Sequence, residues 1–145
     1  MKKIICIVAV VLMIASVVYA QKAKKAGITA KDLAAMKGTY SGSISFGEFD
    51  GGGSSACTFE ILNDAAPVKA KLTVSQVPAA VASSLGIMTN PAPFQSEDGT
   101  LTSQGTIMFT GAEKNFLEVA KSGEKKIKLY YWFKGLKGDG TLTKK

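Results

Sequence analysis

The residues with the most evident chemical potential lie near the C-terminus, where lysines alternate with aromatic residues. Successive side chains of an extended strand point to opposite faces, so one face would carry Lys126, Lys128, Tyr130, Trp132 and Lys134. Lysines attract anions, and aromatic rings stack on sugars or bases. The spacing predicts a surface for an anionic lipid or glycan. The alternative is that another segment covers Trp132 and that the lysines only keep the protein soluble.

A cysteine, a glycine run and scattered acids are the other candidates for chemistry. Cys57 lies on a predicted strand, where we expect a buried apolar thiol rather than a reactive one. The run Gly51-Gly52-Gly53-Ser54 lacks the lysine of a phosphate-binding loop and precedes a strand, so it indicates a hairpin loop. The acids follow no calcium-loop spacing. We predict no metal ion.

Two absences from the composition limit catalysis. The chain contains no histidine, and all of its 18 basic residues are lysines. Without histidine there is no imidazole base and no histidine-ligated zinc site. Without arginine there is no bidentate clamp for phosphate or carboxylate. Paired carboxylates and a Ser-Lys dyad are the catalytic groups that remain. Because most of the usual catalytic groups are absent, we predict a protein that is not an enzyme and uses no cofactor.

The N-terminal residues have the pattern of a signal peptide. Lys2 and Lys3 precede an apolar run at residues 4–18, and Val18-Tyr19-Ala20 fits a cleavage site. The alternative is an uncleaved membrane anchor, but the run is shorter than the about 20 apolar residues that a spanning helix needs. We predict cleavage after Ala20 and a periplasmic or secreted protein. This location makes a lipid or sugar partner more plausible than nucleic acid.

The remainder is long enough for one domain. Cleavage after Ala20 would remove Lys2 and Lys3 and lower the net charge from +7 to +5. Residues 21–37 are predicted to form a lysine-rich N-terminus and a short helix, and residues 38–145 a β-barrel domain. Cys57 is the only cysteine after residue 20, so we expect no internal disulfide bond.

Hydrophobic periodicity predicts a mainly β fold. Thr29 and Asp32 have the spacing of a helix cap, and a period of two then begins at residues 40–46. Further strands are predicted at residues 57–61, 68–75, 100–102, 106–110, 116–121, 125–134 and 141–143, with a second short helix at residues 78–85. Residues 100–102 and 106–110 are either separate strands or one strand bent at Gly105. Asp98-Gly99 is predicted to form a hairpin and Gly138-Asp139-Gly140 a final turn.

These elements predict a single antiparallel up-and-down barrel, or a sandwich, of seven to eight short strands with two short helices, because such strands must bury their apolar faces. Inward-facing large residues are candidates for contact with an apolar ligand: Tyr40, Ile44, Phe59, Leu72, Leu129 and Tyr131. Small residues are also expected on inward faces, namely Gly42, Cys57, Ala70 and Gly105. They either leave room for a ligand or let large neighbours pack.

The start of the β region resembles that of the calycins, the lipocalin-like small secreted barrels. A short helix is followed by Gly38-Thr39-Tyr40-Ser41-Gly42, with Tyr40 where that family has a tryptophan. The arginine that packs on the tryptophan in lipocalins has no counterpart here. The resemblance implies an apolar-ligand barrel with Tyr40 at its closed end.

Together, these features predict an exported, non-catalytic binding module, lipocalin-like, for an apolar or amphipathic small ligand such as an envelope lipid. The alternative is a protein-interaction module, for example a periplasmic protease inhibitor or an envelope assembly factor, in which the interior plays no part. Fold alone does not separate these functions.

Overall fold

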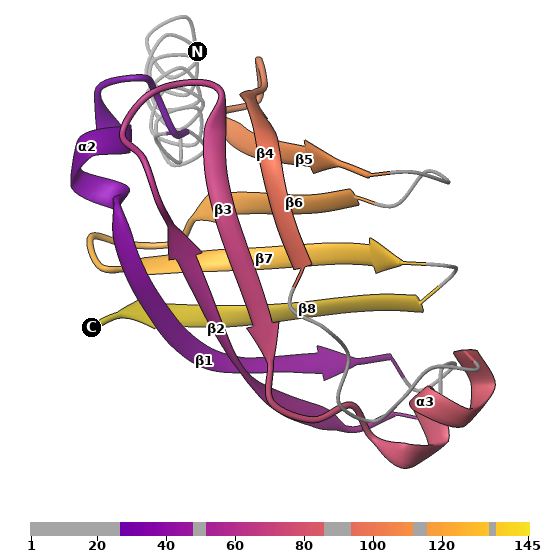
Figure 1. Cartoon of the computed structure of the whole chain (residues 1–145). Coiled ribbons are helices and arrows are strands. Elements are labelled where there is room, and N and C mark those ends of the chain that lie inside the picture. The colour runs from indigo at the N-terminus through magenta and orange to yellow at the C-terminus, as the bar shows by residue number, and fades with distance from the viewer. Residues whose placement is uncertain (1–26, 48–51, 86–93, 112–115, 134–135) are drawn as a thin grey trace, which may run out of the picture.

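The chain forms a closed antiparallel barrel of eight strands in the order β1 to β8 (Figure 1). The structure is a computed structural model that describes residues 27–47, 52–85, 94–111, 116–133 and 136–145. The strands are β1 (Gly38–Phe46), β2 (Ser54–Ile61), β3 (Val68–Val74), β4 (Phe94–Leu101), β5 (Thr106–Thr110), β6 (Phe116–Lys121), β7 (Lys126–Phe133) and β8 (Leu136–Lys144). Each strand pairs with the next, and β8 also pairs with β1.

This topology confirms the predicted up-and-down barrel and excludes the sandwich. Pairing of β8 with β1, from Tyr40 opposite Lys144 to Phe46 opposite Gly138, leaves neither strand with a free edge. Closure therefore satisfies the backbone groups that an open sheet would expose. The predicted alternation is seen clearly in β3, where Val68, Ala70 and Leu72 are buried within the barrel.

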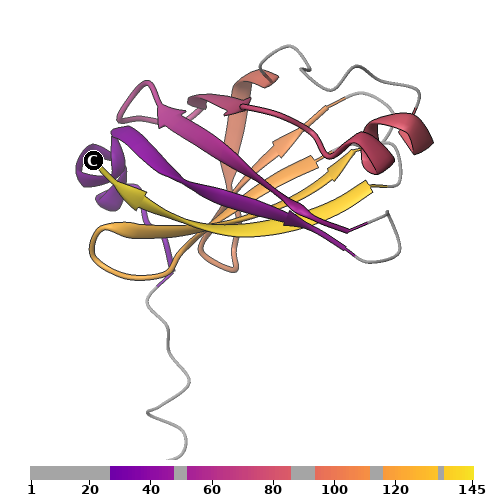
Figure 2. The same ribbon diagram turned by 90° about the horizontal axis from the view of Figure 1, so that it is seen from below.

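Two helices predicted from the sequence lie at opposite ends of the barrel (Figure 2). Helix α2 (Asp32–Met36) precedes β1, and α3 (Ala79–Leu85) follows β3. We call these the α2 end and the α3 end. Leu33 and Met36 of α2 are buried in the main core, whereas Ala82 of α3 belongs to a second, smaller apolar cluster.

The predicted hairpin at Asp98-Gly99 is wrong, because both residues lie within β4. Val68 pairs with Gly99 but Ala70 pairs with Ser96, so β4 has one extra residue at this point, which makes a β-bulge. A Cβ on Gly99 would lie 2.3 Å from the Phe109 ring. Glycine at position 99 is therefore needed for close packing under an aromatic ring. The chain reverses after β4, in a turn that contains Gly105 with a φ of 74°.

The predicted turn at Gly138-Asp139-Gly140 is also wrong, because these residues are part of β8. A Cβ on Gly138 would lie 2.2 Å from the Tyr131 ring, and one on Gly140 would lie 2.2 Å from the Ser43 carbonyl oxygen. The two glycines therefore allow an aromatic side chain and strand β1 to approach β8 closely. Their role is in packing and not in chain reversal.

Several predictions fall outside the described residues: the signal peptide at residues 1–20, most of the lysine-rich N-terminus, Gly51 and Lys134. Within the described ranges, no helix has the length and apolar character needed to cross a bilayer.

Candidate functional site

The α2 end of the barrel is closed by a helix that two lysines hold in place. Lys121, at the end of β6, donates a hydrogen bond of 2.8 Å to the Asp32 carboxylate at the start of α2. Lys144, at the end of β8, donates one of 2.6 Å to the Ala35 carbonyl in the last turn of α2. A cation at the carboxyl end of a helix is also favourable for the helix dipole. Both ends of α2 are thus bound to the barrel wall.

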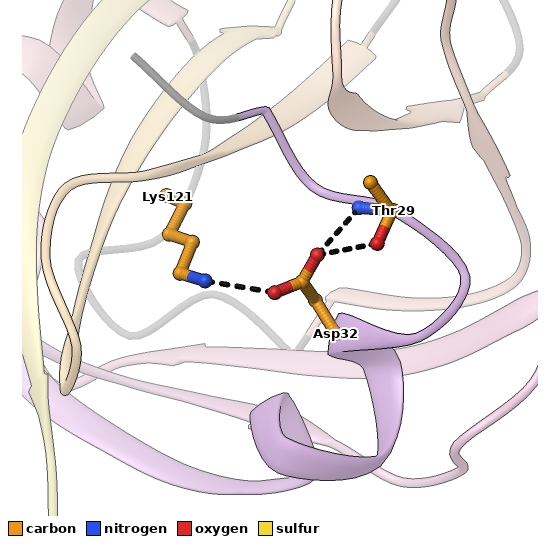
Figure 3. A network of polar contacts seen from close by, with 3 residues as sticks. All are labelled: Thr29, Asp32 and Lys121. Carbon is orange, nitrogen blue, oxygen red and sulfur yellow. Dashed lines mark hydrogen bonds and ion pairs between the residues drawn. The ribbon is translucent and has the colours of Figure 1, made fainter.

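The Asp32 carboxylate accepts further hydrogen bonds from Thr29 (Figure 3). The Thr29 amide donates at 2.9 Å and its hydroxyl at 2.6 Å. The bond from Lys121, followed by those from Thr29, lowers the pKa of Asp32 well below its usual value. The prediction that Thr29 caps the helix is wrong, because α2 begins at Asp32 with Lys31 at the N-cap position and no side-chain cap hydrogen bond. Thr29 instead donates to the Asp32 carboxylate.

The segment before α2 also packs against this end. The Ile28 amide donates a hydrogen bond of 2.7 Å to the Gly105 carbonyl, and the Ile28 side chain is buried in the main core. A Cβ on Gly105 would lie 2.4 Å from the Gly27 Cα. Gly105 therefore lies in the β4–β5 turn against the N-terminal segment, and its predicted place on an inward strand face is wrong.

Tyr40 completes the closed end. Its side chain is buried, and its hydroxyl donates a hydrogen bond of 2.8 Å to the Met36 carbonyl of α2. Burial raises the pKa of Tyr40 above its ordinary value. The residue stands at the closed end, where the resemblance places it, and it joins β1 to α2.

The middle of the barrel is filled by side chains. Ile44, Phe59 and Leu129 have no exposed surface, and the Phe59 ring meets Phe109 edge-on at 6.2 Å between ring centroids. A Cβ on Gly42 would lie 2.7 Å from the Leu142 side chain. The small inward residue therefore makes room for a large neighbour at this level, as expected for a narrow eight-stranded barrel.

The α3 end has a different character. Phe46, Val77 and Ala82 form an apolar cluster that is separate from the main core. Val74 and Tyr131 pack against both clusters and remain partly exposed, and the Tyr131 ring meets Phe46 edge-on at 6.0 Å. Helix α3 covers this cluster through Ala82. Of the predicted ligand-contact residues, Tyr131 lies at this end. Leu72, which is buried, lies two residues before Val74 on the same face of β3.

Polar and thiol groups are few at the α3 end. Ser55 is the one buried polar residue recorded among the described residues, and Cys57 follows it on the same inward face of β2. Burial raises the pKa of the Cys57 thiol to about 11, so it is protonated at neutral pH and has the buried apolar role that we predicted. The α3 end is therefore mainly apolar, with Ser55 and the protonated Cys57 thiol as its few polar groups.

Sequence reasoning missed most of this site. Phe46 could have been found, because it continues the alternation of the first strand. Val77 and Ala82 come from a loop and a helix, and no periodicity in the strands indicates that they fold over the barrel end.

The outer face of β6–β8 brings most of the predicted lysine–aromatic surface together. Trp132 lies nearly parallel to Phe116, with ring centroids 6.3 Å apart, and the Lys137 ammonium lies 4.5 Å from the Trp132 centroid. Lys128 lies 4.8 Å from the Tyr130 centroid and 3.4 Å from the Asp139 carboxylate. Lys126 is exposed at the start of β7. Lys137 was expected near this surface from its place in the sequence, whereas Phe116 was missed because it lies on a neighbouring strand. Strand register pairs both residues with Trp132.

No protein-family model, curated protein or solved structure matches this chain. The closed eight-stranded antiparallel barrel is compatible with the calycin-like architecture. Among the described residues, no group of three or more cysteine and acidic side chains is placed to hold a metal ion.

Proposed function

We propose that the protein is an exported, non-catalytic carrier that binds one small apolar or amphipathic molecule at the α3 end of its barrel. The observation that carries this proposal is the difference between the two barrel ends. The α2 end is bound by Lys121, Lys144 and Tyr40, whereas the α3 end has a separate apolar cluster with partly exposed Val74 and Tyr131.

The packed middle of the barrel limits the size and depth of this site. Because Ile44, Phe59 and Leu129 fill the central level, we expect a ligand to bind between that level and α3. The ligand would contact Val74 and Tyr131, and its alkyl or ring portion would lie inside the barrel. The other predicted contacts, including Tyr40 at the α2 end, would support the barrel rather than contact the ligand.

Export and the absence of catalysis belong to the same proposal. The signal-like residues 1–20 support a periplasmic or secreted location, and the lack of histidine and arginine supports a binding role.

A fluorescent fatty acid tests the proposal directly. We expect the purified protein to bind dansyl-undecanoic acid with a blue shift of the dansyl emission, and Val74→Phe to weaken binding at least tenfold by filling the site. Leu62→Phe is the matched control, because Leu62 follows β2 at the α2 end and is 45% exposed. Circular dichroism would verify that both variants fold. Equal binding by Val74→Phe, Leu62→Phe and the unchanged protein would contradict an α3-end site.

A further inference from the structure

The outer face of β6–β8 has an apolar and basic patch at the same barrel end as the proposed ligand site. We define the outer patch as Phe116, Tyr130, Trp132, Lys128 and Lys137. Strand β6 begins at Phe116, β7 ends at Phe133 and β8 begins at Leu136. Strand β1 runs in the same direction as β7 and ends at Phe46, which packs with Ala82 of α3. The start of β6, the end of β7 and the start of β8 therefore lie at the same end of the barrel as α3 (Figures 1 and 2).

The packing within the outer patch decides which partner it suits. Trp132 lies on β7, with Phe116 beside its ring from β6 and Lys137 over its ring from β8. The Lys137 ammonium therefore occupies one face of the Trp132 ring, and Phe116 lies beside the ring. A sugar binds an aromatic residue by stacking on an open face, so this arrangement disfavours a glycan.

The same packing suits a bilayer interface. Tryptophan and tyrosine prefer the level of the lipid headgroups, and lysines place their alkyl chains along apolar surface while the ammonium group reaches anionic phosphates. Tyr130 is 38% exposed, and Lys128 and Lys137 lie beside the rings. The form expected after cleavage at Ala20 has a net charge of +5, which favours an anionic surface over a neutral one.

We infer that the outer patch is a docking surface for an anionic lipid bilayer. Docking there places the α3 end at the membrane, with the strand ends of β6–β8 against the headgroups. The interior site is not needed for docking itself, so the two proposals stand or fall separately.

Trp132 is the only tryptophan of the chain, so the tryptophan fluorescence reports on this docking directly. We expect vesicles of phosphatidylcholine with about one third phosphatidylglycerol to shift the Trp132 emission to the blue, and brominated acyl chains to quench it. Vesicles of pure phosphatidylcholine should have a much smaller effect, because each basic charge near an anionic surface contributes about 1 kcal/mol.

Three charge reversals locate the contact. Lys137→Glu changes the charge by two units inside the outer patch and should weaken vesicle partitioning by about 30-fold. Lys126→Glu, on the same face but at the opposite end of β7, should have a smaller effect. Lys69→Glu is the matched control, because Lys69 is exposed on β3, the strand farthest from β7 around the barrel. Phe116→Gln should weaken the part of the binding that remains at high salt.

The possible results are separable. An unshifted Trp132 emission on anionic vesicles, or equal weakening by all three reversals, would overturn the inference. A shift with a soluble anionic oligosaccharide but none with vesicles would show a glycan surface and would overturn it too. Binding of dansyl-undecanoic acid, measured without vesicles, should be unchanged in Lys137→Glu, and vesicle docking should be unchanged in Val74→Phe.

Discussion

At the scale of single residues, the most informative contact is that of Asp32 with Lys121 and Thr29. These three residues join the N-terminal segment, helix α2 and strand β6 through one carboxylate. Because the hydrogen bonds favour the ionised carboxylate, its protonation and the attachment of α2 are thermodynamically linked.

The linkage predicts a specific dependence of stability on pH. The pKa of Asp32 is lower in the folded than in the unfolded protein, where it is near 3.8, so the contribution to stability is present above about pH 4 and is lost as the pH falls further. We expect Asp32→Asn to lower the urea midpoint at neutral pH. The difference from the unchanged protein should narrow below about pH 4.

The Lys121→Met background is the control for this prediction. Without the lysine, the difference in urea midpoint between the Asp32 chain and its Asp32→Asn variant should become smaller at neutral pH. Midpoint differences that do not depend on pH, or that are the same with and without Lys121, would show that the ion pair contributes nothing to holding α2.

At the scale of elements, glycines decide how closely β8 approaches its neighbours. Gly138 lies against the Tyr131 ring, and Gly140 lies against the β1 backbone at Ser43. Both positions are in β8 rather than in a turn, although Gly-Asp-Gly is a common turn sequence. The close approach of another backbone or ring is the other physical reason for glycine in a strand.

Gly140→Ala is therefore expected to destabilise the barrel by about 1–3 kcal/mol, because the added methyl group would push β1 and β8 apart. The free energy of unfolding in urea measures this change. Gly123→Ala is the matched control, because a Cβ there meets only Lys126 Cβ at an ordinary 3.7 Å. Equal stability of the two variants would mean that β8 accommodates a side chain at position 140 and that close approach does not explain the glycine.

At the scale of the whole molecule, the two barrel ends differ: helix α2 is bound to one end, and a small buried apolar cluster with partly exposed neighbours lies at the other. The α2 end is linked through Lys121, Lys144 and Tyr40, and its neighbouring segment packs through Gly27 and Gly105. At the α3 end, Val74 and Tyr131 lie between the main core and the smaller cluster. This asymmetry is the basis for our proposal that the ligand binds at the α3 end, whereas the proposed membrane contact rests on the outer patch.

Export is the prediction that belongs to the chain as a whole. We expect the exported form to begin at Gln21, because Val18-Tyr19-Ala20, at the end of the apolar run, has the pattern of a cleavage site. N-terminal sequencing of protein from the periplasm or the medium is the measurement. A membrane-bound form that retains residues 1–20 would contradict cleavage and support the alternative of an anchor.

The sequence by itself determined the mainly β class, the strand at Phe116–Lys121, the short helices before β1 and after β3, and the buried role of Cys57. These features are local, because the alternation of apolar and polar side chains and the cap-like spacing of Thr29 and Asp32 depend on neighbouring residues.

Only the tertiary structure decided that β8 closes on β1, that Asp98-Gly99 lies in a bulged strand and that Gly138-Asp139-Gly140 lies in β8. It also decided that Phe46, Val77 and Ala82 form one cluster and that Phe116 and Lys137 flank Trp132. These contacts join residues far apart in the chain, and strand register determines them. A local pattern of turn residues contains no information about the ring or backbone that will pack against it, so the same glycines that indicate turns serve here as points of close approach.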